Sequence, residues 1–353
     1  MQTLKKLLNP KVITSTLLSA AFLAFLLTFA NSREVWGEIV AALPVVVVPV
    51  FFLILIYLVA KVVQWKIYLA RLGIRPDWQE LLVPYAGGEI GNSLPMGVYL
   101  ENYLLKGASG SGFGRSAAAT TWMLITEIIT CLLALLAIGV PGWPWVRPLA
   151  GGLLLGMVLV GVFLFKTRVL HRLLERWHPR HRWAQSAGKG VRQFLEGGAQ
   201  LFSWHTFVYG LPLTAIYLGA YATALYVIGN MLIAPVGFPW TWTDAAIAFA
   251  FSLVIVLLVP VLPHLGTVEA SGLGVLLVLG VSRNLAVASF LTIRMVATGS
   301  IIVMCGMALI LLHREVSQVL RQLSQRTRRK PGKDCERAEE SAGTDWQCKE
   351  AEV

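Results

Sequence analysis

The sequence predicts an all-α, polytopic membrane protein. Of the 353 residues, 56% are apolar and only 14% are charged, and the mean hydropathy is +0.67. Soluble domains rarely combine these values. A transmembrane helix needs about 18–25 apolar residues, and six continuous stretches reach that length: Val12–Ala30, Leu43–Ala60, Ser116–Val140, Pro148–Lys166, His205–Gly229 and Leu285–Leu312. We therefore expect about six full spans.

The net charge of +11 is concentrated between the spans and at the two ends of the chain. The basic groups are Lys5, Lys6 and Lys11, then Lys61, Lys66, Arg71 and Arg75, then the cations of residues 166–192, and finally the run Arg314–Lys333. The positive-inside rule assigns all of them, and so both termini, to the cytoplasm. The opposite loops, at Asn31–Ala42, Pro141–Arg147 and Asn230–Asp244, hold few cations. The first two spans then form a hairpin, and Gln64–Trp78 is expected to be a cytoplasmic connector.

Two further apolar regions are interrupted by glycine, proline and ionisable residues. They are Trp78–Lys106, with Glu89, Glu101 and Asn102, and Asp244–Val281, with Glu269. A straight helix of such composition would leave backbone groups unpaired in lipid. We therefore expect two broken helical hairpins, either re-entrant or paired, which bring the membrane segments to eight or more. The expected hinge positions are Pro95, Gly97, Pro263 and Gly266.

The two broken regions are related by a constant shift. Pro95 and Glu101 are six residues apart, as are Pro263 and Glu269, and the two pairs are 168 positions apart. The same shift superimposes Leu43–Ala60 on Leu211–Ile228 and Leu81–Leu105 on Phe249–Leu273. Counting the spans gives the two halves, 43–139 and 205–312, opposite directions across the membrane. The sequence thus predicts an inverted repeat within residues 1–315, an architecture of many transporters.

Two polar segments are expected in the cytoplasm. Residues 167–200 form an amphipathic basic loop, which we expect to lie on anionic lipid headgroups rather than to bind nucleic acid. Residues 316–353 are mostly charged and are expected to be largely disordered. The spacing of His171, His178 and His181 fits no zinc motif. We expect neither a metal nor a cofactor.

Ionisable side chains at membrane depth are costly, so each is a candidate for function. Glu269 has a counterpart in Glu101, and its alternative role is that of a structural carboxylate. Arg294 suits a phosphate clamp, or an ion pair with Glu269, Glu127 or Glu101. Asn92 has an alternative role as a hydrogen-bond partner for unwound backbone. His264 has two alternative roles, a structural hydrogen bond and a proton relay. The candidate substrate-binding residues are Arg294, Glu269, Glu101, Glu127, Asn92 and His264.

The block Pro263–Glu269, followed by Gly280-Val281 and Ala288 to Arg294, resembles the second signature of the lysylphosphatidylglycerol synthase transmembrane-region family. Members include the flippase half of the multiple peptide resistance factor. The matching positions are Gly266, Glu269 and Arg294. The first signature fits at Asn92, Leu94-Pro95, Gly97 and Tyr103-Leu104-Leu105, but Val98 stands where an acid is common and Glu101 where an arginine is common.

This resemblance implies a flippase-like lipid translocase of the bacterial inner membrane. The lipid it implies is a phospholipid, an aminoacyl lipid, a hopanoid or a glycolipid. The alternatives are a membrane-embedded lipid-modifying transferase and a scaffold that presents lipid to a partner enzyme. We expect no enzymatic activity, because the carboxylates are scattered without a paired motif. A lipid-synthesis enzyme and a second copy of the chain remain open as partners.

The predicted topology is tested by labelling single cysteines with a membrane-impermeant reagent. Cysteines at positions Gly142 and Gly237 should react from outside, and a cysteine at Lys189 only from inside, because basic segments remain in the cytoplasm. A reversed result at one of the two outer positions alone would remove the argument for inverted halves.

Overall fold

The computed structural model describes residues 28, 30–91, 99–109, 112–166, 182–258, 264–317, 319 and 321. Within these residues the regular structure is entirely helical. By length and apolar composition, five of the described helices are able to cross a membrane: Ser32–Arg71, Phe113–Ile138, Val146–Phe163, Trp204–Val236 and Arg283–Leu311. These helices confirm five of the predicted spans, while the sixth, Val12–Ala30, lies almost wholly outside the described residues.

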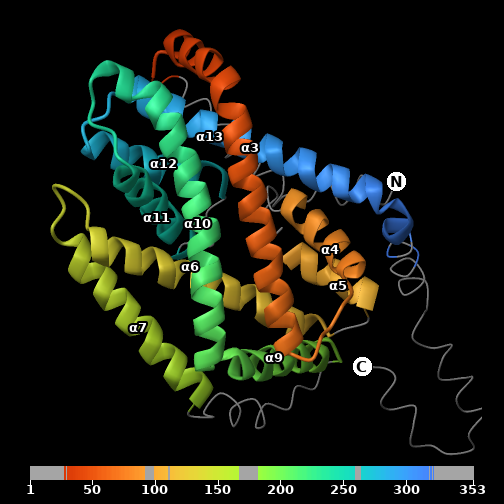
Figure 1. Ribbon diagram of the computed structural model, residues 1–353. Coiled ribbons are helices and arrows are strands. Elements are labelled where there is room, and N and C mark those ends of the chain that lie inside the picture. The colour runs from red at the N-terminus through yellow and green to blue at the C-terminus, as the bar shows by residue number, and fades with distance from the viewer. Residues whose placement is uncertain are drawn as a thin grey trace, which may run out of the picture.

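The centre of the fold is the antiparallel pair of α3 (Ser32–Arg71) and α10 (Trp204–Leu232). Figure 1 shows α3 descending from its N-terminus at the top while α10, in green, ascends beside it. The two helices are in close contact at Gly210, where an added Cβ would lie 2.0 Å from the Tyr68 hydroxyl oxygen. Glycine is therefore required for this contact.

The α3 helix is longer than the sequence indicated at both ends. The expected outer loop Asn31–Ala42 was wrong: Asn31 caps the helix by accepting a hydrogen bond from the Arg33 amide, and Val35 and Ile39 continue the buried face upward. The charged residues of this stretch misled the prediction, because they lie on the exposed side. The expected connector Gln64–Trp78 was also wrong in its first half, since α3 runs to Arg71 and buries Trp65 and Tyr68.

The two broken regions each contain two short helices, as predicted. The first contains α4 (Trp78–Gly91) and α5 (Leu100–Ser109), and the second contains α11 (Trp242–Leu258) and α12 (His264–Val278). Each helix packs on its partner. At about 1.5 Å per residue, none is long enough alone to cross a hydrocarbon core of about 30 Å. In Figure 1, the α4–α5 pair and the α11–α12 pair lie on opposite sides of α3 and α10.

The remaining long helices connect the two halves. The α6 helix (Phe113–Ile138) packs on α10 and α11, whereas α13 (Arg283–Leu311) packs on α3 and α4. The last helix of each predicted half thus packs against helices of the other half. Two hydrogen bonds join the starts of α3 and α13. The Asn284 side chain donates to the Glu34 carboxylate at 2.5 Å and accepts from the Asn31 backbone N–H at 3.1 Å.

A surface helix, α9 (Arg182–Leu201), lies across the lower ends of α3 and α10 in Figure 1. It approaches α6 so closely that a Cβ at Gly114 would lie 2.3 Å from the Gly190 carbonyl oxygen. Gln200 also donates to the Arg71 carbonyl at 2.5 Å. The second part of the predicted amphipathic segment 167–200 is therefore a helix, while its first part lies outside the described residues. The α7 helix (Val146–Lys166) and the short η2 (Ala234–Val236) complete the description.

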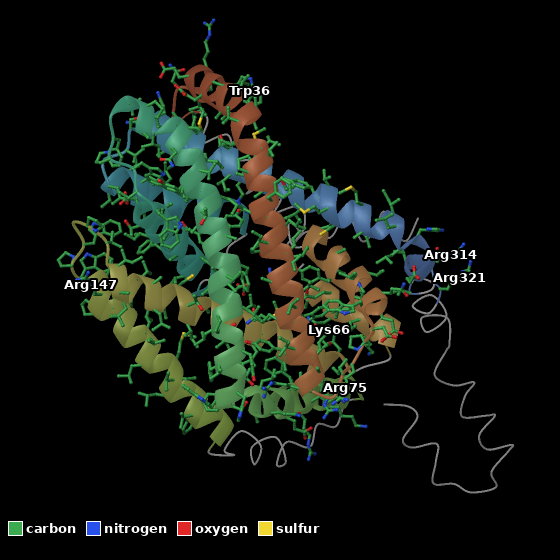
Figure 2. All side chains as sticks on the ribbon, viewed as in Figure 1. Trp36, Lys66, Arg75, Arg147, Arg314 and Arg321 are labelled. Atoms are coloured by element: carbon green, nitrogen blue, oxygen red, sulfur yellow. The ribbon has the colours of Figure 1, made fainter. Side chains whose placement is uncertain are left out.

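Figure 2 labels side chains at several edges of the protein. Lys66 and Arg75 lie low on α3, and Trp36 lies near the top of the same helix. Arg314 and Arg321 lie at the far right, beyond the end of α13, and Arg147 lies at the far left.

The close contact at Gly210 predicts a matched pair of variants. Gly210→Ala should destabilise the protein by about 1–3 kcal/mol, because the new methyl group overpacks the interface against Tyr68. Gly219→Ala lies on the same helix, but its Cβ would meet nothing within 4 Å, so it should be neutral or stabilising by up to about 1 kcal/mol. Thermal unfolding in detergent measures both, and equal melting temperatures would contradict the assigned contact.

Candidate functional site

Three carboxylates are buried among the membrane helices. Glu89, Glu101 and Glu127 are exposed by only 7%, 9% and 6%. They come from α4, α5 and α6, and a fourth charged group, Lys61 of α3, lies beside them with a side chain exposed by 14%. We call these four residues, with Tyr57 and Tyr217, the polar cluster.

The cation of the polar cluster is held by two partners. The Lys61 ammonium lies 2.9 Å from Glu89 Oε1 and donates to the Tyr57 hydroxyl at 2.8 Å. It also lies 5.0 Å from the centre of the Tyr57 ring. Lys61 and Tyr57 are one helical turn apart on α3, so they lie on the same side of the helix. This ion pair therefore links α3 to the first broken hairpin.

The Glu127 carboxylate receives its hydrogen bond from the other half of the chain. Tyr217 of α10 donates to Glu127 Oε1 at 2.9 Å, and the Tyr217 ring meets the Tyr57 ring edge to face at 5.6 Å. An edge-to-face pair of this kind adds stability beyond the burial of its area. The carboxylate of α6 is thus enclosed by α3 and α10.

The Glu101 carboxylate is fixed by short hydrogen bonds at the start of α5. Thr120 donates to Glu101 Oε1 at 2.6 Å, and Asn102 donates to Thr120 at 2.9 Å. On the other side, a Cβ at Gly88 would lie 2.6 Å from the Glu101 Cβ. The glycine therefore lets α4 pass close to α5 and brings the Glu89 turn near Glu101.

The charges of the polar cluster do not balance. If all groups are ionised, three carboxylates face one ammonium, and only Glu89 has a cationic partner among the described residues. Burial of an ionised group without a counter-charge is costly. The polar cluster therefore favours further positive charge, from a proton or from a cationic group of a ligand.

A second polar contact lies one turn further along α3. The Gln64 amide nitrogen is within 3.2 Å of four oxygen atoms, which belong to Tyr68, Thr126, Thr214 and the Gly210 backbone. Since Gln64 is fully buried, these contacts satisfy a group that would otherwise be costly in hydrocarbon. They join α3, α6 and α10 next to the polar cluster.

Two of the predicted site residues, Glu101 and Glu127, are buried members of the polar cluster, and their role in substrate binding stays a prediction. Arg294 is partly buried in α13, and Gly266 is helical within α12. His264 and Glu269 belong to the same helix, but their side chains lie outside the described part. The predicted residues outside the described ranges are Asn92, Pro95, Gly97 and Pro263.

Sequence reasoning missed Lys61, Tyr57 and Tyr217. The assignment of Lys61 to the cytoplasmic cations was wrong, because α3 continues for ten residues beyond it and places it opposite Glu89. The sequence did contain a signal: Lys61 is flanked on both sides by apolar residues, and a buried lysine there would need a carboxylate such as Glu89 as its partner. The two tyrosines gave no signal, since aromatic residues are equally common at lipid-facing positions.

No group of three or more histidine, cysteine or acidic residues in the described part of the chain is arranged to hold a metal ion. The two described cysteines, Cys131 and Cys305, are buried and unpaired with each other. The described polar cluster offers hydrogen bonding and charge pairing.

These features define a polytopic α-helical membrane protein whose interior carries ionisable groups. The family model described as "Lysylphosphatidylglycerol synthase TM region" matches residues 12–305. The chain belongs to this family, as its second signature indicated. No curated protein matches the chain.

The ion pair of the polar cluster predicts a coupled effect on stability. Lys61→Met leaves Glu89 buried without its ammonium and should destabilise the protein by about 3–5 kcal/mol, the usual result of breaking a buried pair. The double variant Lys61→Met/Glu89→Leu removes both charges and should recover most of the loss. Melting temperatures of the single and double variants measure the coupling.

The control for this cycle is Glu196→Gln, which removes an exposed pair with Arg192 at 3.1 Å. An exposed pair contributes less than about 1 kcal/mol, so this variant should melt like the unmodified protein. If the double variant melts no higher than Lys61→Met, Glu89 does not depend on Lys61.

Proposed function

We propose that the protein is a lipid translocase that moves a phospholipid or lipid-linked headgroup across the bacterial inner membrane. The observation that carries this proposal is the polar cluster, which is buried between α3, α4, α5, α6 and α10. Ionisable groups are rarely placed inside membrane helices without a functional role. Membership of a lipid-related membrane family supports the same conclusion.

The relation between the two halves supports an alternating mechanism. A shift of 168 places α5, residues 100–109, on residues 268–277 within α12. It places α6, residues 113–138, on residues 281–306, which overlap α13 almost completely. The antiparallel course of α3 and α10 is the relation that inverted halves require (Figure 1). Inverted halves of this kind rock against each other around a shared site.

Each candidate residue has a role in this proposal. Arg294 holds the phosphate of the headgroup, since a guanidinium suits phosphate oxygens. Glu101, Glu127 and Glu269 balance that charge or contact a cationic group of the headgroup, and the two broken hairpins supply the moving parts. The acyl chains remain in the bilayer. The basic α9 and both termini face the cytoplasm, where anionic headgroups attract them.

The test is lipid exchange in liposomes that contain the purified protein. Exchange of labelled lipid, followed by dithionite quenching of the outer leaflet, should be faster than in protein-free liposomes. Glu127→Gln, Glu269→Gln and Arg294→Ala should each slow it by at least about tenfold, as expected for the loss of one charged contact. Glu196→Gln is the matched control, because its carboxylate lies on the surface.

Three outcomes separate the candidate functions. Exchange at the protein-free rate across a panel of phospholipids and glycolipids would count against translocation. Chemical conversion of the lipid would instead favour a membrane-embedded transferase. Copurification of one lipid without exchange or conversion would favour a scaffold that presents lipid to a partner enzyme.

A further inference from the structure

Two hydroxyl groups in the second half of the chain are buried without a partner. Ser289 and Thr292 of α13 are both 0% exposed, and neither Ser289 Oγ nor Thr292 Oγ1 makes a hydrogen bond in the part of the protein that the structure describes. The two residues are three positions apart, so they lie on the same face of the helix. They are thus a pair of unpartnered polar groups on one face.

Other hydroxyls on the membrane helices of this protein behave differently. In helices, serine and threonine usually donate to the carbonyl three or four residues earlier. Described hydroxyls that do so over 2.6–2.9 Å include those of Thr121, Thr130, Thr223 and Ser252. Ser289 and Thr292 have the same option on their own helix but do not take it. Their hydroxyls are therefore not satisfied by the backbone of their own helix.

The surroundings make this absence of partners costly. Every residue from Leu285 to Phe290 is exposed by 7% or less, and α13 packs on α3, α4, α10 and α12. A polar group buried there without a hydrogen bond loses its hydration and gains nothing. The free-energy cost of such a pair is offset only where water or the polar part of a ligand supplies the missing hydrogen bonds.

The equivalent position in the first half is satisfied. Position 289 minus 168 is position 121, and the Thr121 hydroxyl donates to the Ala117 carbonyl at 2.9 Å and contacts the Tyr99 hydroxyl at 3.2 Å. The first half is instead polar through its charged groups at Lys61, Glu89 and Glu127. Three of the four charged groups of the polar cluster thus lie at positions of the first half that carry no equivalent of Ser289 or Thr292, whereas α13 of the second half places these two neutral hydroxyls on the same helix as Arg294.

We propose that Ser289 and Thr292 form a second headgroup site, which binds the phosphate or hydroxyl oxygens of the translocated lipid. The proposal rests on the proposed function. It adds a binding site on α13 to the one that the polar cluster provides. A hydroxyl both donates and accepts, so the pair binds oxygen-rich headgroups of either charge state. Before lipid enters, water occupies the same positions.

The first experiment measures access to these positions in the full-length chain. Ser289→Cys and Thr292→Cys are made in a background in which the four native cysteines are replaced by serine or alanine. Each protein, in maltoside detergent, is treated with a membrane-impermeant thiol reagent. Ala288→Cys is the matched control, because Ala288 is also 0% exposed and lies on the same helix.

Both hydroxyl positions should react at least about tenfold faster than position 288, the ratio that a difference of 1.4 kcal/mol in access produces. Short-chain phosphatidylglycerol, which offers phosphate and hydroxyl oxygens, should slow both reactions, whereas diacylglycerol of equal chain length should not. Reaction as slow as at position 288 would overturn the site. Fast reaction with equal slowing by both lipids would overturn headgroup binding.

A second experiment removes the hydroxyls themselves. Ser289→Ala and Thr292→Val should raise the melting temperature, since an unpartnered polar group is replaced by an apolar one of similar size. The same variants should slow lipid exchange severalfold. A structural role predicts the opposite for stability, so lower melting temperatures would contradict the proposal, as would exchange at the unmodified rate.

The labelling experiment is independent of transport. If the unmodified protein exchanges no lipid, the proposed translocation fails. Fast labelling with selective protection by phosphatidylglycerol would still establish the second headgroup site.

Discussion

The close packing of α3 against α10 is the contact on which the rest of the structure depends. These two helices belong to different halves of the chain, and they meet where Gly210 leaves room for the Tyr68 hydroxyl. In a bilayer, helices gain little from apolar burial, so small residues and interhelical hydrogen bonds must supply the specificity. The buried Gln64 amide provides such bonds to α6 and α10 at the same level. The positions of α4, α6 and α13 then follow from this pair.

The free-energy cost of burying the polar cluster is reduced because the cluster lies where α3, α6 and α10 meet. Lys61 and Tyr57 reach it from α3, Tyr217 from α10, and Glu127 from α6, so each charged group is enclosed by helices and kept from lipid. The cluster also joins the halves through hydrogen bonds that depend on geometry. Any relative movement of α3 and α10 would therefore change the contacts of Glu127.

The architecture was largely accessible from the sequence, because the length of apolar stretches and the positions of glycine and proline follow directly from the bilayer and the backbone. The two broken regions contain two short helices each for this reason. The ends of α3 were not accessible: Asn31 acts as a cap and Lys61 as a buried cation, although both look like residues of a loop or an interface. Glu101 and Glu127 were identified as candidates by their depth alone, whereas their partners Thr120 and Tyr217 depend on packing between segments far apart in sequence.

The surface helix α9 has a consequence for how the protein sits in its membrane. It lies across the ends of α3 and α10 (Figure 1) and is bound to α3 through Gln200 and to α6 through the contact of Gly114 with Gly190. With α9 in the headgroup region, as the sequence predicts, the helices attached to it would keep a fixed insertion depth at that end. A bilayer that is too thick or too thin would then be accommodated at the opposite ends of α3 and α10. Hydrophobic mismatch would thus act on one side of the protein only.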